Sequence, residues 1–432
     1  MILQTIFKRV LREGSVTLID HDGRRHTFGG SPIVTSTTTG PAPGPVTLRI
    51  TDPRFARRFL AGPEMAIGEA YMDGTLILEE GSIYDLVATL IHNVYRHSRR
   101  TAFFRLHWAL NRALRWFHQY NPIERAERNV AHHYNLSAEM YRLFLDGDRQ
   151  YSCAYWPPGI ETLEDAQRAK KRHIAAKLRL EPGQSVLDVG CGWGGLALHL
   201  AREHDVHVTG ITLSSEQFHV AQERAKAEGL ADRVTFRLQD YRHVTETFDR
   251  IVSVGMFEHV GVNHYRDFFE ATRARLKEDG IFLLHTIGRA EPPGGTNAWL
   301  RKYIFPGGYT PALSELSAAV ERADWIPTDV EVLRVHYAET LRHWRARFEA
   351  QRERIVTQLY DARFYRMWMF YLAGCEAVFR FDRQVVFQMQ MTRSLDAAPI
   401  TRDYITDAER AANAAAADAA ERPAPTLVRR VG

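Results

Sequence analysis

Hydrophobic and polar positions follow different patterns before and after Glu181-Pro182-Gly183. In the first part, residues 46–50 alternate apolar and polar side chains like a strand, whereas 54–60 and 83–95 have the spacing of helices. These elements predict a small α+β domain over residues 1–95. In the second part, short apolar runs alternate with helical segments, which is typical of a parallel sheet covered by helices on both faces.

The second part therefore predicts an α/β fold. A glycine-rich turn separates its first strand from a helix that ends near His204, and another helix runs from Ser215 to about residue 229. Helices dominate from 312 to 380, and residues 384–391 have the pattern of a late edge strand. The other strands are expected at 185–189, 206–211, 234–238, 250–254 and 281–285.

Two further segments differ from both patterns. Residues 96–128 interleave arginines with Phe and Trp, which fits a helix that connects two domains or one that lies in a lipid interface; nucleic-acid binding fits less well, because no recognised module is present. The tail, 396–432, is alanine-rich and is expected to be mobile or weakly helical. The chain is thus divided into 1–95, 96–128, 129–395 and 396–432.

Composition narrows the class of protein. The 432 residues carry 56 Lys and Arg against 52 Asp and Glu, and 45% are hydrophobic, which excludes a disordered or collagen-like chain. Cys153, Cys191 and Cys375 are far apart in sequence, so neither a disulfide framework nor a metal site is expected, and a cytoplasmic location fits. No run of about 18 apolar residues would span a membrane, so the protein is expected to be soluble or to lie on a membrane surface.

The turn after the first strand reads Asp188-Val-Gly190-Cys-Gly192-Trp-Gly194-Gly. Glycines allow a tight turn and a close approach of the backbone to a ligand, although close packing of strand against helix would also favour them. A dinucleotide site would place an acidic residue about 20 residues later. The second strand instead ends in Thr212-Leu213-Ser214, which argues against NAD. With Asp188 opening the turn, the pattern resembles class I S-adenosylmethionine methyltransferases.

Four polar residues near strand ends have open interpretations. Gln217 can contact a cofactor or, in a capping box, reach back to the amide of Ser214. Asp240 can accept an adenine amino group or be a solvated loop acid. Glu258 follows the fourth strand and His285 ends the fifth; each alone fits a surface acid or a buried histidine, but ligands of open α/β sheets bind at the carboxyl ends of strands, so together they indicate a reaction site.

Several motifs, in order along nearly the whole chain before the tail, give a resemblance to the family of cyclopropane-fatty-acyl-phospholipid synthases and mycolic acid cyclopropane synthases. Beside the glycine turn they are GEAYMDG (68–74), EEGSIY (79–84), HHYNLS (132–137), YSCAYW (151–156), GITLS (210–214), FEHVG (257–261) and LHTIG (284–288). The resemblance implies a Rossmann-like class I methyltransferase sheet as the catalytic domain, with a small α+β N-terminal domain.

The activity implied is methyl transfer from S-adenosylmethionine to a cis double bond in an acyl chain of a membrane phospholipid, followed by deprotonation by bicarbonate and closure of a cyclopropane ring. The residues that the resemblance places around bicarbonate are Glu258, His285, Tyr337 (in HYAETL, 336–341) and the backbone of Cys153 and Ile287. Glu258 must then be protonated or share a proton with the anion. The implied cofactor-contacting residues are Tyr151, Ser152, Asp188, Gly190, Gly192, Thr212, Leu213, Gln217 and Asp240.

The implied partner is the phospholipid bilayer at the inner face of the membrane, with no nucleic acid and a possible homodimer. The N-terminal domain and the connector then become candidate docking elements. Three alternatives stay open: the same methyl transfer ending in a methyl-branched or methylated unsaturated chain, methylation of a small soluble substrate, and a lipid-binding protein without catalysis.

Overall fold

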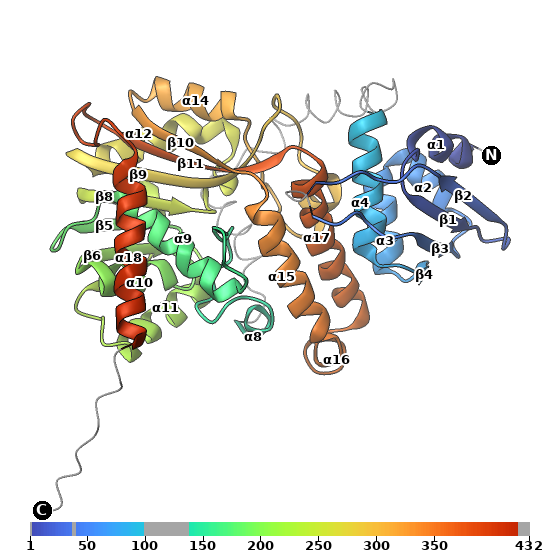
Figure 1. Cartoon of the computed structure of the whole chain (residues 1–432), viewed down its shortest axis with the longest axis horizontal. Helices are drawn as coiled ribbons and strands as arrows, with labels where there is room; N and C mark the ends of the chain where they lie inside the picture. Colours follow the sequence, from blue (N-terminus) through green and yellow to red (C-terminus); the bar gives the residue numbers. More distant parts are fainter. Residues whose placement is uncertain (1, 37–39, 99–137, 422–432) are drawn as a thin grey trace, which may run out of the picture.

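The computed structural model describes residues 2–36, 40–98 and 138–421. Most of the predicted connector and the HHYNLS motif lie outside these residues. The N-terminal part is the small α+β unit that the sequence predicts, with a sheet in the order β2-β1-β3-β4 (Figure 1). Its elements are α1 (Ile2–Val10), β1 (Ser15–Ile19), β2 (Arg25–Gly29), β3 (Val46–Ile50), α2 (Phe55–Ala61), α3 (Pro63–Met72), β4 (Leu76–Glu80) and α4 (Ile83–Asn93).

The second part contains a seven-stranded sheet in the order β10-β11-β9-β8-β5-β6-β7, in which β11 runs antiparallel to the other six strands. This sheet confirms the predicted α/β fold. Its strands are β5 (Ser185–Val189), β6 (His207–Thr212), β7 (Val234–Leu238), β8 (Phe248–Val254), β9 (Leu276–Arg289), β10 (Ile326–Leu333) and β11 (Gln384–Thr392).

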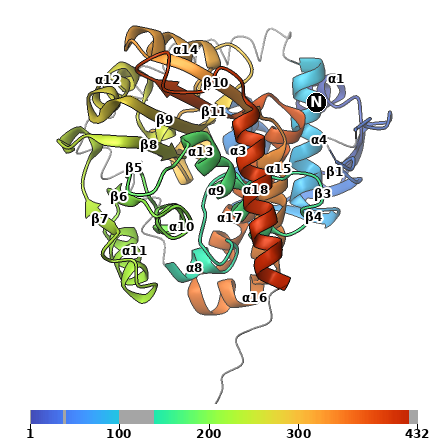
Figure 2. The same cartoon turned by 60° about the vertical axis from the view of Figure 1, so that its left-hand side comes forward.

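Helices cover both faces of this sheet because consecutive residues of each strand point to opposite sides. On β5, Val186 packs in one apolar cluster with α9 (Leu163–Leu178), α10 (Gly195–His204) and α11 (Ser215–Ala227). Its neighbour Leu187 packs in another cluster with α12 (Tyr265–Arg275) and α14 (Leu313–Arg322). Figure 2 shows these two helical layers around the sheet.

Two predictions about the edge of this sheet are wrong. Residues 384–391 belong to β11, which lies between β9 and β10 rather than at an edge and is buried along nearly its whole length. The edge strand on this side of the sheet is β10, in a region that the sequence predicts to be helical. The alternation of apolar and polar residues expected of a strand is weak in β10. The apolar Val330 and Val332 are half-exposed at the edge, whereas the charged Asp329 is buried and pairs with Lys177.

Of the two predictions for the tail, a mobile or a weakly helical segment, the structure agrees with the second over residues 403–421. Residues Asp403–Glu421 form helix α18, which lies along α9 in both cartoon views (Figures 1 and 2). Ile405 is buried, and Tyr404 hydrogen-bonds to Gln390 on β11. These apolar and polar contacts give the alanine-rich helix a partner, which an isolated helix of this kind needs for stability.

A pair of helices, α15 (His336–Ala350) and α17 (Ala362–Phe381), joins the two parts of the molecule. Helix α17 packs against α15, α3 and α4, and one continuous apolar core runs from the N-terminal sheet through these helices. On the N-terminal side, Glu69 of the GEAYMDG motif accepts hydrogen bonds from Lys302 and Tyr303 at 2.8 Å each. That motif therefore attaches the N-terminal domain to α13 (Ala298–Tyr303).

Gly68 is expected to be needed for this attachment. A Cβ at Gly68 would lie 2.4 Å from the buried Trp299 ring, whereas a Cβ at Gly374, another helical glycine, would meet nothing within 4 Å. We expect Gly68→Ala to lower the free energy of unfolding by about 1–3 kcal/mol through overpacking. The control Gly374→Ala should raise it by about 0.5–1 kcal/mol, because alanine favours a helix. Denaturant unfolding measures both, and equal effects would contradict this account of the interface.

Candidate active site

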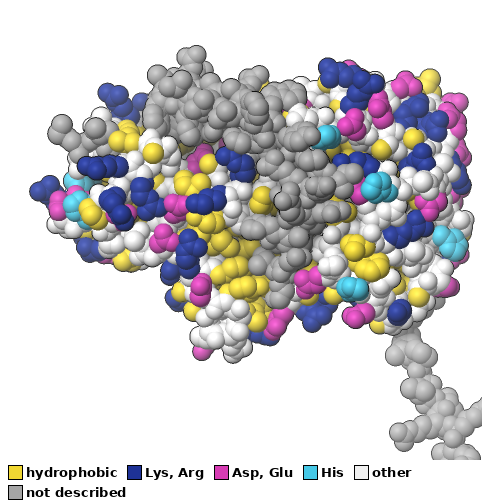
Figure 3. All heavy atoms as spheres, turned by 180° about the vertical axis from the view of Figure 1, so that it is seen from behind, with side chains coloured by type: hydrophobic (Ala, Val, Ile, Leu, Met, Phe, Trp, Pro, Cys, Tyr) yellow, Lys and Arg dark blue, Asp and Glu magenta, His cyan; other side chains and the backbone are white. Residues whose placement is uncertain are grey.

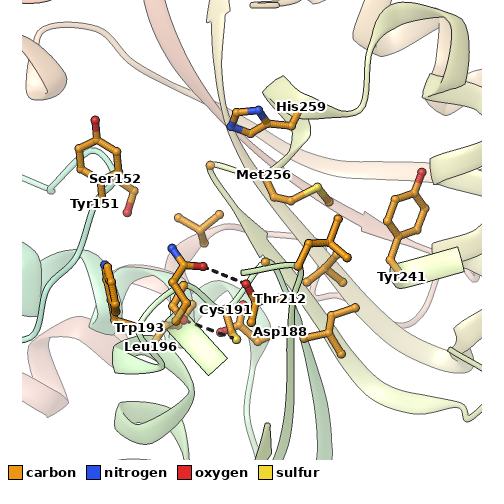
Figure 4. Close-up of a pocket in the computed structure, with 18 of the residues that line it drawn as sticks. Tyr151, Ser152, Asp188, Cys191, Trp193, Leu196, Thr212, Tyr241, Met256 and His259 are labelled. Atoms are coloured by element: carbon orange, nitrogen blue, oxygen red, sulfur yellow. Dashed lines mark hydrogen bonds between the residues drawn. The ribbon is translucent and has the colours of Figure 1, made fainter. Parts of the chain in front are cut away.

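A first cavity, of about 150 Å³, lies at the carboxyl ends of β5, β6, β7 and β8. The structure brings together here all nine residues predicted to contact a cofactor: Tyr151, Ser152, Asp188, Gly190, Gly192, Thr212, Leu213, Gln217 and Asp240. Figure 4 shows the labelled members around one space, with Tyr151, Ser152 and Trp193 on one side and Tyr241 on the other. The position agrees with the general rule that ligands bind beyond the carboxyl ends of parallel strands.

The glycine turn has the geometry of a cradle for a ligand. Gly190 and Gly192 have φ of +85° and +53°, a region that residues with side chains rarely adopt. A Cβ at Gly190 would lie 2.7 Å from Met256, so this position also needs glycine for space. Around Gly192 a Cβ would meet nothing within 4 Å, which leaves its backbone open to the cavity.

Asp188 is the clearest sign that this cavity takes a ligand with a donor group. It is buried, and its Oδ2 has no hydrogen-bond partner among the described residues. Burial raises the pKa of Asp188 to about 7. The amino group and hydroxyls of S-adenosylmethionine can donate to such an oxygen, so the residues present fit this cofactor.

The Thr212–Gln217 region forms only half of the predicted capping box. Ser214 Oγ accepts the Gln217 N–H at 3.3 Å, which caps α11. The prediction that the Gln217 side chain reaches back to the Ser214 amide is wrong: its Oε1 accepts from the Thr212 hydroxyl at 2.9 Å, and the Ser214 amide donates to Thr212 Oγ1. The dashed line to Thr212 in Figure 4 marks the bond between the Thr212 hydroxyl and Gln217 Oε1. Gln217 lines the cavity.

Asp240 is buried and is not a solvated loop acid. Arg242 donates to both of its carboxylate oxygens, at 2.8 and 2.7 Å. Burial would raise the pKa of Asp240, but the hydrogen bonds from Arg242 outweigh it and hold that pKa below its usual value. A carboxylate has about four lone-pair sites, so one bound adenine amino group could still be accepted.

Lys170 is a residue of this region that sequence reasoning missed. Its Nζ is fully buried and donates to Gln150 Oε1 at 2.7 Å and to Ser152 Oγ at 2.9 Å. Burial lowers the pKa of Lys170 to about 7. The available signal was its place on the apolar face of α9, four residues from both Ala166 and Ile174.

A second cavity, of about 850 Å³, adjoins the first. The two share Tyr151, Ser152, Gly255 and His259 in their walls. One wall is a face of α17, and another combines residues of α1 and α4 in the N-terminal domain. Most of the lining is apolar, and the volume is within the range of small-molecule sites.

All five residues predicted to hold the reacting groups line this second cavity: Cys153, Glu258, His285, Ile287 and Tyr337. Glu258 lies in a 3-10 helix, Phe257–His259, just after β8, and His285 lies on the neighbouring strand β9. The expected convergence of the carboxyl and the imidazole on one cavity is therefore observed. Tyr337 lies in the first turn of α15 and packs on Phe379 and Trp344.

Glu258 is in a setting that favours a protonated carboxyl. Its Oε1 accepts the Ile287 N–H at 2.6 Å, and its Oε2 is buried without a hydrogen-bond partner among the described residues. Burial raises the pKa of Glu258 to about 7. The Ile287 amide thus orients Glu258 in this structure.

His285 is a neutral imidazole. Burial lowers its pKa well below the usual value. Gln388, its partner across the β9–β11 register, donates to Nδ1 at 3.1 Å, which leaves the proton on Nε2. Cys153 is also neutral, because burial raises the pKa of its thiol. His285 and Cys153 therefore present neutral groups to this part of the cavity.

The pH dependence of stability tests the protonation of Glu258. The unfolded carboxyl ionises near pH 4.5 and the folded one near 7, so its stabilising effect is present below pH 4.5 and is lost as the pH rises to 7. Each unit of pKa difference corresponds to ~1.4 kcal/mol. Between pH 4.5 and 7 the free energy of unfolding of wild type should therefore fall by about 3 kcal/mol relative to that of Glu258→Gln. Denaturant unfolding at several pH values measures the difference, and parallel curves for the two proteins would contradict it.

Comparisons with known proteins agree with this geometry. Residues 122–389 match the family described as "Mycolic acid cyclopropane synthetase". Over 355 residues the chain is 39% identical to the cyclopropane-fatty-acyl-phospholipid synthase of Escherichia coli (strain K12), covering 82% of this chain and 89% of that protein. A probable fatty acid methyltransferase of Pseudomonas putida is 38% identical over 355 residues, covering 79% of this chain and 85% of that protein.

Solved structures are similar as well. Mycolic acid cyclopropane synthase CmaA1 complexed with SAH and CTAB is 35% identical, with a TM-score of 0.59, over 63% of this chain and 98% of that one. The cyclopropane synthase MmaA2 from Mycobacterium tuberculosis has the same TM-score of 0.59 at 33% identity, over 63% of this chain and 99% of that one.

Proposed function

The chain belongs to the mycolic acid cyclopropane synthetase family, and from this premise we propose that it cyclopropanates unsaturated acyl chains of phospholipids in a membrane. The coarser activity follows from the family: the protein is an S-adenosylmethionine-dependent methyltransferase that acts on double bonds of lipid chains. The observation that carries the finer proposal is the junction of the two cavities. There the first cavity, which would hold the cofactor, shares part of its wall with the larger, mostly apolar cavity beside Glu258 and His285.

The first cavity would hold the cofactor. Gly190 and Gly192 would give it an open backbone, Asp188 would accept from its donor groups, and Tyr151 and Ser152 lie where the two cavities meet. When bound, S-adenosylmethionine supplies an electrophilic methyl group on a sulfonium. An alkene is a weak nucleophile, so the protein must hold one alkene carbon in line with that methyl.

The second cavity would hold the acyl chain and keep water away. Attack on the methyl leaves a carbocation on the chain, which water would capture. Apolar walls exclude water, and aromatic rings such as Tyr337 and Tyr371 can stabilise positive charge. The hydroxyl of Tyr371 lies 2.8 Å from that of Tyr151, which fixes both rings.

We further propose that bicarbonate is the base that removes the proton before ring closure. Protonated Glu258 and the Nε2–H of His285 are donors that can hold such an anion, and the Tyr337 hydroxyl can donate as well. The Ile287 amide would act through Glu258, which it orients at 2.6 Å. Cys153 would contribute backbone groups, because its thiol already donates to the Ala154 carbonyl at 3.2 Å.

Access of a lipid would be from the side of the N-terminal domain. Figure 3 shows hydrophobic side chains gathered in the middle of one face, between the two parts of the molecule. On α1, Ile6, Phe7 and Val10 line the apolar cavity, whereas Lys8 and Arg9 are exposed. No helix among the described residues is long and apolar enough to cross a bilayer. We propose that α1 docks on the membrane surface, with Lys8 and Arg9 toward the lipid headgroups.

Removing the two charges on α1 should weaken docking. Each basic residue near anionic lipid is worth about 1 kcal/mol, so the double change Lys8→Gln and Arg9→Gln should reduce affinity for anionic vesicles about 30-fold. The control is Lys226→Gln with Arg266→Gln, two exposed residues on helices of the α/β domain. Vesicle co-sedimentation measures both, and an equal loss in the control would contradict docking through α1.

The experiment that tests the proposed function uses purified protein, S-adenosylmethionine and vesicles of a cis-monounsaturated phospholipid. The expected product is an acyl chain that has gained one CH₂ and resists catalytic hydrogenation, as a ring does. A product that takes up hydrogen would instead be a methylated unsaturated chain, and an added methyl with no unsaturation and no ring would be a branched one. Either outcome, or turnover only of soluble substrates, would overturn the proposal.

A further inference from the structure

Helix α18 is held on the α/β domain by polar contacts along one side. Arg402, just before the helix, pairs with Asp329 at 2.9 Å, and Asn413 accepts from Arg172 at 2.9 Å. Between them Glu409 reaches His173 on α9. The helix lies beyond residue 389, where the match to the family ends, so the family gives it no role.

His173 is the centre of these contacts. It is buried, its Nδ1 lies 2.7 Å from Glu409 and its Nε2 lies 2.6 Å from Glu331, which also pairs with Lys177 at 2.5 Å. Burial would lower the pKa of His173, but the two hydrogen bonds to carboxylates outweigh it and raise that pKa. Both ring nitrogens therefore donate, and the imidazolium is fixed from two sides.

The ring of His173 begins a stack of three. The Tyr155 ring lies parallel to it with centroids 4.2 Å apart, and the His336 ring lies parallel to Tyr155 on its other face at 5.0 Å. His336 Nδ1 accepts the Trp156 N–H at 2.8 Å. A charged imidazole on a tyrosine face adds cation–π attraction to the stacking.

Tyr155 and His336 of the stack are close in sequence to residues that line the proposed reaction cavity. Tyr155 is two residues after Cys153, and His336 directly precedes Tyr337; both Cys153 and Tyr337 line that cavity. Thr340, one turn along α15, accepts the Ala154 N–H at 3.1 Å. Segment 151–156 is therefore tied to the first turn of α15.

We propose that Glu409 is a positioning residue, which through His173 and the ring stack holds segment 151–156 and the first turn of α15 in the geometry that the reaction needs. Glu409 lines neither cavity. Its effect is transmitted by fixing the His173 ring against the Tyr155 ring. Small displacements of groups around a reacting centre are enough to lower turnover.

The test compares full-length variants by hydrogen exchange and by turnover. Glu409→Ala should increase amide exchange at 151–156 and 336–341, whereas Asp407→Ala, an exposed carboxylate on the same helix, should not. The exchange arm does not depend on the proposed function, whereas the turnover arm rests on it. In the vesicle assay Glu409→Ala should lower kcat about tenfold with the KM for S-adenosylmethionine within about twofold of wild type.

Changes at Tyr155 distinguish positioning from a general loss of stability. Tyr155→Phe keeps the aromatic ring of the stack and should retain wild-type kcat. Tyr155→Leu removes the ring and should lower kcat about as much as Glu409→Ala does. Glu409→Ala and Tyr155→Leu would act through the same ring stack. The double variant that combines them should therefore have a kcat no lower than that of the slower single variant. Unchanged exchange in Glu409→Ala would overturn the inference, and so would effects that multiply in the double variant.

Discussion

Replacing Glu258 by Gln is expected to lower turnover of lipid by about three orders of magnitude, within the range of about 10²–10⁴ that a positioned acid or base contributes. Gln has nearly the same shape, and its amide oxygen can still accept the Ile287 N–H that Glu258 accepts at 2.6 Å. What it lacks is a carboxyl proton that can be shared with an anion. Affinity for S-adenosylmethionine should be unchanged, because Glu258 lines the second cavity and not the first.

The control for this prediction is Glu315→Gln. The Glu315 carboxylate also accepts a backbone N–H, that of Ala312 at 3.0 Å, but it lines neither cavity. Steady-state rates with vesicles and calorimetric titration of S-adenosylmethionine measure the two effects. If Glu258→Gln turned over as fast as Glu315→Gln, Glu258 would have no part in the chemistry.

Gly374→Phe is expected to lower kcat/KM for lipid by about 100-fold, the cost typical of misplacing a substrate relative to its reacting partner. Gly374 lies on the face of α17 that lines the apolar cavity, together with Phe370, Tyr371 and Val378. Glycine within a helix is unfavourable, yet apart from its own stretch of helix no described atom lies within 4 Å of where its Cβ would be. The space is therefore open to an acyl chain, and a phenyl ring would fill it.

Gly374→Ala is the matched control, since one methyl group leaves most of the space open. Binding of S-adenosylmethionine should be the same in Gly374→Phe, Gly374→Ala and wild type, because Gly374 does not line the first cavity. Wild-type kcat/KM in the Phe variant would mean that the acyl chain does not pass α17.

Much of the fold was predictable because the strands of the parallel region carry their own signal. Strands such as β5, with Val186 packed on one face and Leu187 on the other, are apolar runs bounded by turns. The signal failed at β10, where Asp329 points inward and half-exposed valines mark an edge. In the tail it left a mobile and a weakly helical segment open, because alanines gave no indication of a partner. In both places tertiary contacts decide the structure.

The candidate site was predictable to the extent that it lies at strand ends. Asp188, Glu258 and His285 follow or end strands of one sheet, so their convergence follows from the topology. The walls supplied by α1, α4 and α17 were not predictable, because these helices meet only through the docking of two parts far apart in sequence. The domain boundaries at 95, 128 and 395, the homodimer and the location at the inner face of the membrane stay predictions.

The most direct measurement of the central claim is a crystal structure of the protein with S-adenosylhomocysteine and a cis-monounsaturated phospholipid. We predict the adenosyl group over Gly192 and the acyl chain between α4 and α17, with its double bond between the cofactor sulfur and Glu258. A chain bound elsewhere, or a double bond remote from Glu258 and His285, would contradict the account.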